Sequence, residues 1–254
     1  MRNEFKYMVR YDHLESLRKS ILSYVDYDSH TPDSDSFGEY TVRSIYFDTY
    51  KLEYYYEKRM GIKMRKKIRI RSYNDLAGYK DQNPKVFLEV KRKIDNFIAK
   101  DRSSVDWNNL NAVLTTGDVE KYINGNGANG DYDNARRFFY YMKGKLLQPL
   151  VLIVYEREAF FSKFDPYFRV SIDKNIRSMG FPEISDLFVN QGLDPSFYDY
   201  FVLEIKFSGA FPSWMADVLF RHKLTREAVS KYKICLDYYR VWETQNRLKL
   251  FNIG

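Results

Sequence analysis

A strand-like alternation of charged and apolar residues recurs along the chain and constrains its fold more than any other feature. In the segment Lys67-Ile68-Arg69-Ile70-Arg71, a charged residue stands at every second position. Because successive side chains of a β-strand point to opposite faces, the arginines share one face and the isoleucines the other. The same period recurs at residues 2–7, 87–91, 168–173 and 202–206. These segments predict a sheet with one charged face and one apolar face.

The alternation allows two interpretations. A single segment of this kind is typical of an ordinary half-buried strand, on which Glu89 with Lys91, or Glu204 with Lys206, would form ion pairs on a solvated face. The set as a whole favours a second interpretation, because the charged positions contain Arg, Lys, Glu and Asp almost alone. If such strands closed into a barrel with the charges inward, the lumen would suit a polyanion with a metal ion. The residues alone leave open which face points inward.

Length and composition favour one β-rich domain with an anionic partner. The chain has 254 residues, within reach of one large domain, and we predict a single domain over residues 1–254. Its 23 Tyr and 19 Phe favour strands. The formal charge of +7 favours an anionic partner without choosing between nucleic acid, a membrane surface and phosphate ligands. No nucleic-acid motif such as an RRM signature is present, so we expect no nucleic-acid partner.

Three further features predict a cytoplasmic protein. Cys235 is the single cysteine, which excludes an intrachain disulfide and fits a reducing compartment. The N-terminus is not followed by an apolar run, so no secretory signal is expected. The longest apolar run, residues 150–154, is far too short to cross a bilayer. The three histidines, His13, His30 and His222, are scattered, and we assign them no role.

We predict eight strands, a number at which a barrel can close around its own side chains or one small ligand. They span residues 2–10, 39–47, 63–73, 86–92, 97–105, 150–163, 167–177 and 201–207. A helix should open at Asp12 with a capping box that Glu15 completes. Further helices are expected at residues 49–60, 106–123, 134–147, 213–222 and 225–242.

Eight segments together resemble the VTC domain, the catalytic module of polyphosphate polymerases in the triphosphate-tunnel (CYTH-like) superfamily. They are residues 2–7, 44–48, 67–73, 87–91, 155–160, 168–173, 203–206 and 230–232, in the family's order and over almost the whole chain. The resemblance implies an α+β fold, an eight-stranded antiparallel β tunnel flanked by helices, with the charged face inward. It implies a polyphosphate polymerase that transfers the γ-phosphate of ATP to a growing inorganic polyphosphate chain.

One departure bears on the choice of branch within the superfamily. The hydrolase branch typically opens with Glu-x-Glu-x-Lys, whereas Arg2 holds the first position here and leaves only Glu4. This favours the polymerase, with a tripolyphosphate or nucleoside-triphosphate hydrolase, or a non-catalytic polyphosphate or triphosphate binder, as alternatives. The yeast members carry SPX and transmembrane parts that have no counterpart here. We therefore expect a stand-alone soluble form, with any membrane or protein partner encoded separately.

The resemblance also implies roles for the charged residues. The catalytic set is Lys6, Arg69, Arg71, Lys91, Arg157, Arg169 and Lys206, and the substrate-binding set is Glu4, Glu89, Lys100, Arg102 and Lys231. Glu204 is the expected ligand of a divalent metal, Mn²⁺ in preference to Mg²⁺, with Asp173 a weaker candidate. Phosphoryl transfer needs positioning and charge neutralisation, which arginine forks and lysine point charges supply.

The resemblance and the ordinary interpretation predict opposite results for one substitution. In a lumen crowded with like charges, Arg69→Ala or Arg71→Ala should lower triphosphate affinity while stability holds or rises. If these arginines are instead salt-bridged to Glu89 or Glu4, their removal should lower stability.

Overall fold

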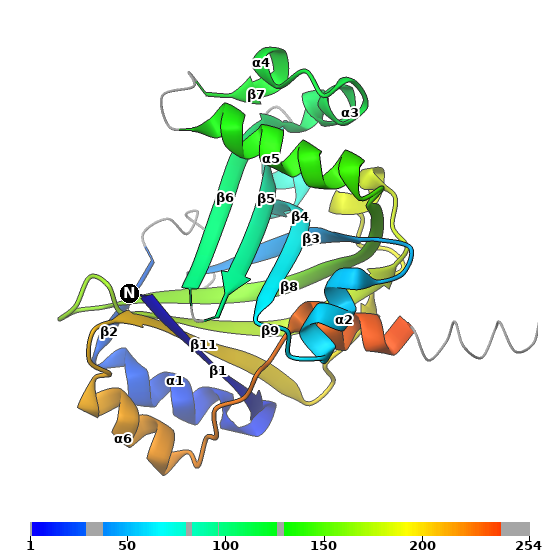
Figure 1. Ribbon diagram of the computed structural model, residues 1–254. Helices are drawn as coiled ribbons and strands as arrows, with labels where there is room; N and C mark the ends of the chain where they lie inside the picture. Colours follow the sequence, from blue (N-terminus) through cyan, green and yellow to red (C-terminus); the bar gives the residue numbers. More distant parts are fainter. Residues whose placement is uncertain (1, 29–37, 80–82, 96, 126–129, 240–254) are drawn as a thin grey trace, which may run out of the picture. The chain divides into compact units, whose positions relative to one another are not determined.

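The structure is a computed structural model that describes residues 2–28, 38–79, 83–95, 97–125 and 130–239 (Figure 1). It is an α+β structure with a large antiparallel sheet. The chain divides into two compact units of interleaved segments. Unit 1 comprises Met1–Thr41, Val154–Arg177 and Pro195–Ser230, and unit 2 comprises Val42–Ile153, Ser178–Asp194 and Lys231–Gly254. The single domain remains a prediction, and each unit is described by itself.

All eight predicted strands are present. They are β1 (Arg2–Arg10), β3 (Glu39–Asp48), β4 (Met64–Tyr73), β5 (Lys85–Ile94), β6 (Phe97–Asp106), β8 (Gln148–Ser162), β9 (Arg169–Gly180) and β11 (Tyr200–Ser208). The sequence missed three strands of two or three residues, β2 (Val25–Tyr27), β7 (Ile123–Asn124) and β10 (Asp194–Pro195). Segments of two or three residues are too short to show an alternation of charged and apolar residues.

The strand order is β1-β11-β9-β8-β3-β4-β5-β6-β7, with β10 paired to β9 and β2 to β8. In the part of the chain that the structure describes, the sheet has eleven strands rather than eight. Over the described residues its order runs from β1 to β7 without closing. A closed tunnel remains a prediction.

In unit 1, helices cover the apolar face of the sheet. The strands β1, β11 and β9 pair antiparallel, so that Phe5 lies opposite Ile205, which lies opposite Val170. Ile205 and Val170 belong to one buried core with residues of α1 (Leu14–Leu22) and α6 (Ser213–Arg221). Figure 1 shows these two helices side by side along one face of β1 and β11. This confirms that Leu203 and Ile205 pack against helices, as the resemblance implies.

Unit 2 repeats this arrangement on other strands. Residues of the apolar phase, Ile45, Phe47, Ile68, Ile70, Leu88 and Val90, are all buried. The helix α5 (Asp131–Gly144) packs across β5 and β6 (Figure 1). The rings of Phe47 and Phe138 of α5 meet edge to face with centroids 6.3 Å apart. The face of β4 that carries Ile68 and Ile70 is thus the face that helices cover.

Asp48 is the last residue of β3, and its side chain lies at the N-terminus of the next helix, α2 (Glu53–Arg59). Its buried carboxylate accepts hydrogen bonds from the backbone N–H groups of Thr49, Tyr54 and Tyr55 at 2.7, 3.0 and 2.9 Å. It also accepts the hydroxyl of Tyr232 at 2.5 Å, from the helix at residues 231–239. One carboxylate therefore satisfies the free donors of a helix N-terminus and attaches a second helix.

Several predicted helix boundaries differ from the structure, since α2 begins at Glu53 rather than at residue 49 and α5 spans Asp131–Gly144 rather than residues 134–147. No capping box forms at Asp12, which lies in the 3₁₀ turn η1 (Tyr11–His13) and accepts from Arg10 Nε at 3.2 Å. The helix predicted over 106–123 is two helices, α3 (Trp107–Thr116) and α4 (Val119–Tyr122). Gly117 separates them because its φ of 76° is left-handed, a conformation that ends helices.

The last helix begins at residue 231, six residues after its predicted start at residue 225. Residues 225–230 are not helical, because the N–H of Glu227 donates to the backbone carbonyl of Lys6 at 2.9 Å and holds this stretch beside β1. The helix described there spans residues 231–239, and residues 240–242 of the prediction lie outside the described part. The remaining short turns are η2 (Leu76–Gly78) and η3 (Ile184–Phe188). No helix in the described ranges is long and apolar enough to span a bilayer.

We predict that Ile205→Ala lowers the free energy of unfolding by about 2–5 kcal/mol, because it leaves a cavity in the core of unit 1. Ile205 is 0 % exposed, whereas Ile94, at the end of β5, is 43 % exposed. The matched variant Ile94→Ala should change stability by less than about 1 kcal/mol. Urea titration followed by circular dichroism measures both, and equal losses would contradict the burial of Ile205 in the core of unit 1.

Candidate functional site

The face of the unit 2 strands opposite α5 carries an ordered array of charged side chains, which we call the basic lattice. Strand register places its members opposite one another in rows. The rows are Ser44, Arg71, Phe87 and Ser104; Tyr46, Arg69, Glu89 and Arg102; Lys67, Lys91 and Lys100; and Arg65, Lys93 and Ile98. Successive rows lie about 7 Å apart, and neighbouring strands about 4.8 Å apart. Glu89 is the one carboxylate among eight cations in these described rows.

Glu89 is the centre of the lattice and is fully buried. Arg69 donates from Nε to Oε2 at 2.6 Å and places Nη2 2.6 Å from the same oxygen. Lys100 Nζ lies 2.7 Å, and Arg102 Nε 3.2 Å, from Oε1. Burial opposes ionisation of this carboxyl, yet Arg69, Arg71 and Lys100 hold the pKa of Glu89 below its ordinary value. Glu89 is therefore a permanent anion that links β4, β5 and β6.

Tyr46 completes the environment of Arg69. The guanidinium donates from Nη1 to the Tyr46 hydroxyl at 2.8 Å. Burial would raise the pKa of this phenol, but the charges of Arg69 and Arg71 lower it below its usual value, and Lys231 adds to the effect. The Tyr46 ring stacks on that of Tyr232, with centroids 5.2 Å apart. Each nitrogen of the Arg69 guanidinium thus contacts Glu89 or Tyr46, which fixes its orientation.

Arginines and aromatic rings lie together at the first two rows and at Tyr73 beyond them. Arg71 is 7 % exposed and donates from Nε to the Ser44 hydroxyl at 3.0 Å. The Arg102 guanidinium lies 3.5 Å from the centroid of the Phe87 ring and donates to the Tyr73 hydroxyl at 3.0 Å. Burial raises the pKa of Tyr73, but the charges of Arg71 and Arg102 outweigh this and lower it overall. Tyr73 follows Arg71 by two residues and extends the lattice by one row.

In unit 1, the strands β1 and β11 bring two carboxylates to one lysine. Lys6 Nζ lies 2.8 Å from Glu4 Oε1 and 3.2 Å from Glu204 Oε2. The other oxygen of Glu204 pairs with Lys206. Burial lowers the pKa of Lys6, but Glu204 and Glu4 more than offset this and raise it above the usual value. Lys6 is therefore a fixed cation between two carboxylates.

Arg157 and Asp173 form a second buried pair in unit 1. The guanidinium donates from Nε and Nη2 to the two carboxylate oxygens at 2.6 and 2.8 Å, and Nη2 also reaches the Tyr155 hydroxyl at 3.4 Å. Burial lowers the pKa of Arg157, but Asp173, Tyr155 and Glu204 raise it well above its ordinary value. Arg169, opposite Lys206 on the neighbouring strand, is exposed and lies 4.0 Å from the Phe161 ring centroid.

The donor set in unit 1 fits a divalent metal only in part. Among the described residues no three Asp, Glu, His or Cys side chains converge on one point. Asp173 is committed to Arg157. Glu4 and Glu204, however, converge on the single ammonium of Lys6. A divalent ion could replace that ammonium, with phosphate oxygens completing its coordination, which is the way Mg²⁺ is held beside nucleotides.

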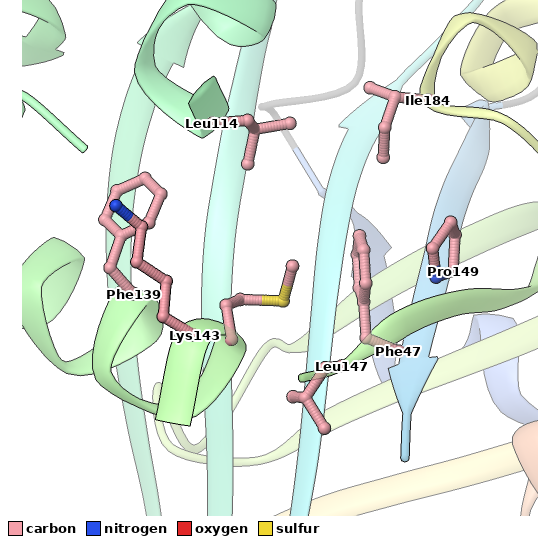
Figure 2. Close-up of a pocket in the computed structure, with 8 residues that line it drawn as sticks. Phe47, Leu114, Phe139, Lys143, Leu147, Pro149 and Ile184 are labelled. Carbon is pink, nitrogen blue, oxygen red and sulfur yellow. The ribbon is translucent and has the colours of Figure 1, made fainter. Parts of the chain in front are cut away.

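A cavity of about 240 Å³ in unit 2 lies on the helix-covered face (Figure 2). Its lining residues are Phe47, Leu114, Phe139, Met142, Lys143, Leu147, Pro149 and Ile184. Phe47 follows Tyr46 in β3 and so points away from the basic lattice. Lys143 is the one charged residue of this lining, and its Nζ lies 6.0 Å from the Phe139 ring centroid. This apolar cavity is unsuited to phosphate.

The structure divides the predicted site residues between the units. Unit 1 contains Glu4, Lys6, Arg157, Arg169, Glu204 and Lys206, and unit 2 contains Arg69, Arg71, Glu89, Lys91, Lys100, Arg102 and Lys231. Because the units are described separately, one shared cavity remains a prediction. The sequence analysis missed Tyr46, Tyr73, Phe87 and Tyr155. Each is an aromatic residue, three of them tyrosines, in the strand phase that elsewhere carries charged residues. This position could have identified them in the sequence.

The sequence model of the VTC domain matches residues 1–239. The chain belongs to the VTC domain family. A solved structure, that of the PH1819 protein from Pyrococcus horikoshii OT3, aligns to 93 % of this VTC domain and 99 % of its own chain, at 10 % identity and a TM-score of 0.45. No curated protein matches the chain.

We predict that Glu89→Gln lowers the stability of this VTC domain by about 3–5 kcal/mol at pH 7, because it leaves buried cations without their counter-ion. The pKa of Glu89 is lowered in the folded state, so its contribution is complete above the unfolded value of about 4.3. The contribution is lost as pH falls from there towards the folded value.

Urea titrations of both proteins between pH 3 and pH 8 test this sign. The stability difference should be constant from pH 6 to 8 and shrink below about pH 4.3. A difference that grows on acidification would contradict the ionised state of Glu89.

Proposed function

We propose that this VTC domain is a polyphosphate polymerase that transfers the γ-phosphate of ATP to the end of a growing polyphosphate chain. The observation that supports it most is the basic lattice, which holds eight cations against one carboxylate. An ordinary solvated sheet face alternates charge signs, because like charges on adjacent strands destabilise it. Lys67, Lys91 and Lys100 instead lie opposite one another on three adjacent strands. A bound polyanion compensates such a row.

The family and the lattice point to the same chemistry. The VTC domain family is consistent with polyphosphate polymerases. Phosphoryl transfer depends on holding the phosphates in line and neutralising their charge. Buried guanidinium groups such as Arg71 give charge-assisted hydrogen bonds to phosphate oxygens in a fixed geometry. The attacking group is a terminal phosphate oxygen, which is already anionic, so the reaction requires no strong general base.

The residues of the lattice have distinct tasks in this proposal. Glu89 and Tyr46 fix the orientation of Arg69, so that its charge is in place before substrate arrives. Arg71 binds the phosphates of ATP beside Arg69, and Arg102 contacts the nucleotide. Lys67 and Lys91 bind the acceptor chain as point charges that tolerate its movement as it grows. In unit 1, Lys6, Lys206, Arg157 and Arg169 provide further cations for the phosphates.

A divalent metal would be held by Glu204 with Glu4, in exchange for the Lys6 ammonium that they share. When bound, it would neutralise the charge that develops on the bridging phosphate oxygens. The choice of Mn²⁺ over Mg²⁺ and a cytoplasmic location remain expectations from the sequence.

The same pair of carboxylates favours a second candidate, a tripolyphosphate or nucleoside-triphosphate hydrolase. Although Arg2 replaces the first glutamate of the hydrolase motif, Glu204 approaches Glu4 from the neighbouring strand and supplies a second carboxylate. The site could therefore hold the metal of a hydrolase. The two candidates differ in the acceptor, which is water in one and a phosphate chain in the other.

The deciding experiment incubates the purified chain with ATP and Mn²⁺ or Mg²⁺ and separates the products by electrophoresis. Long polyphosphate with ADP identifies a polymerase. Free phosphate without polyphosphate identifies a hydrolase. Binding of tripolyphosphate without turnover identifies a binder and would rule out both enzymes.

The neighbours Lys91 and Arg92 on β5 allow a matched test of phosphate binding. Lys91 belongs to the lattice, whereas Arg92 points to the helix-covered face, where it binds both oxygens of Asp101 at 3.0 Å. We predict that Lys91→Ala weakens tripolyphosphate binding more than tenfold, a loss of about 1.5–3 kcal/mol, with an unchanged or higher thermal midpoint. Arg92→Ala should lower the midpoint and leave the affinity within about twofold. Calorimetry measures the affinities and thermal melts the midpoints. The reverse pattern would place the phosphate-binding site on the helix-covered face and contradict the proposal.

We predict that Glu204→Gln abolishes metal-dependent turnover and leaves metal-free tripolyphosphate binding within about threefold, since the cations of the lattice do most of the holding. Turnover is measured across a titration of Mn²⁺, and binding in the presence of a chelator. Normal turnover at limiting metal would exclude Glu204 as the ligand, and Glu4 becomes the next candidate.

A further inference from the structure

We propose that the first row of the basic lattice, with Tyr73 beyond it, binds the base of the nucleoside triphosphate. ATP then lies along the strands, with its base at Phe87 and Tyr73 and its phosphates directed towards the lysine rows. This inference rests on the proposed function and adds to it the direction in which the substrate lies.

The lattice has different chemistry at its two ends. At one end, Phe87 and Tyr73 are half-buried, and their rings meet edge to face with centroids 5.8 Å apart. At the other end, the last two rows carry Lys67, Lys91, Lys100, Arg65 and Lys93. A triphosphate is charged throughout, whereas a nucleotide has one flat apolar end and one anionic end. The aromatic end of the lattice suits the base of a nucleotide, and the lysine end suits its phosphates.

Arg102 connects the two kinds of surface. Its guanidinium lies 3.5 Å from the Phe87 ring centroid and 5.6 Å from that of Tyr73, and its Nε lies 3.2 Å from Glu89. The Arg102 side chain is 34 % exposed, so a ligand can approach it from the side that Phe87 does not cover. Bases stack on aromatic rings and on guanidinium planes alike. A base placed here would leave its phosphates beside Arg71 and Arg69, one row apart.

The other aromatic pair of this face is less suited to a base. Tyr46 and Tyr232 stack on each other, and they are 7 % and 2 % exposed. Phe87 and Tyr73, by contrast, are only half-buried. The stacking surface for a ligand is therefore at the Phe87 end.

The direction has a consequence for the reaction. With the base at the first row, the γ-phosphate lies towards the lysine rows, where the acceptor chain ends. Its transfer breaks the bond to the β-phosphate and forms one to a terminal oxygen of the acceptor. ADP then remains at the aromatic end, and the product extends along the lysines.

The test compares Phe87→Leu with wild type for two ligands, ATP and inorganic tripolyphosphate, by calorimetry in the presence of a chelator. We expect ATP to bind about tenfold more weakly to the variant, since stacking on one ring is lost. Tripolyphosphate affinity should stay within about twofold. Phe87→Trp should restore ATP binding. The control Phe97→Leu removes an aromatic residue that is 58 % exposed on β6 and should change neither affinity.

The outcomes separate this inference from the proposed function. If ATP and tripolyphosphate weaken equally in Phe87→Leu, the ring acts only by positioning Arg102, and the inference is overturned. If ATP affinity is unchanged while wild type still makes polyphosphate, the direction is wrong and the polymerase stands. If wild type binds neither ligand, the proposed function fails with it.

Discussion

A buried carboxylate that holds several cations in place is the interaction on which the charged face of unit 2 depends. Rows of the basic lattice lie about 7 Å apart and strands about 4.8 Å apart, so eight cations on this face repel one another strongly. Glu89 offsets that repulsion at its centre, because Arg69 reaches it from β4 while Lys100 and Arg102 reach it from β6. Arg71 also contributes to the positive charge that keeps Glu89 ionised. One carboxylate balances only part of the positive charge of these rows, and in the proposed function a bound polyphosphate balances more of it.

The two units balance charge differently, which suggests different tasks. In unit 1, Glu4, Glu204 and Asp173 oppose Lys6, Lys206 and Arg157 almost one to one. A polyanion relieves less repulsion on such a face than on that of unit 2, where the cations are in excess. Under the proposed function, unit 2 would therefore provide most of the phosphate binding. Unit 1 would add cations and the carboxylates that could hold a metal ion.

The alternation of the sequence predicted the eight long strands and the face on which each side chain lies, but it could not predict partners. Whether Arg69 lies opposite Glu89 depends on how β4 and β5 are aligned, which turns and packing decide. From the sequence we expected that Arg69→Ala would leave the stability unchanged or raise it. The observed pairing of Arg69 with Glu89 argues against that expectation. Arg69 is salt-bridged to a fully buried carboxylate, and the alternative left open by the sequence, a loss of stability, now fits better. The helix-capping role of Asp48 was unreadable because its partners are backbone groups and a tyrosine far away in sequence.

The charged face also takes part in specifying the fold. On β5, Leu88 and Val90 are buried beneath helices, and Glu89 between them is buried among cations. A slip of one residue in the pairing of β4 and β5 would exchange the two faces. It would place Glu89 in an apolar core without a cation, and leucine and valine among guanidinium groups. Burying an unpaired carboxylate costs several kcal/mol of stability. The charged face and the apolar face therefore both disfavour this shifted register. The residues proposed to bind phosphate thus help to align the strands that carry them.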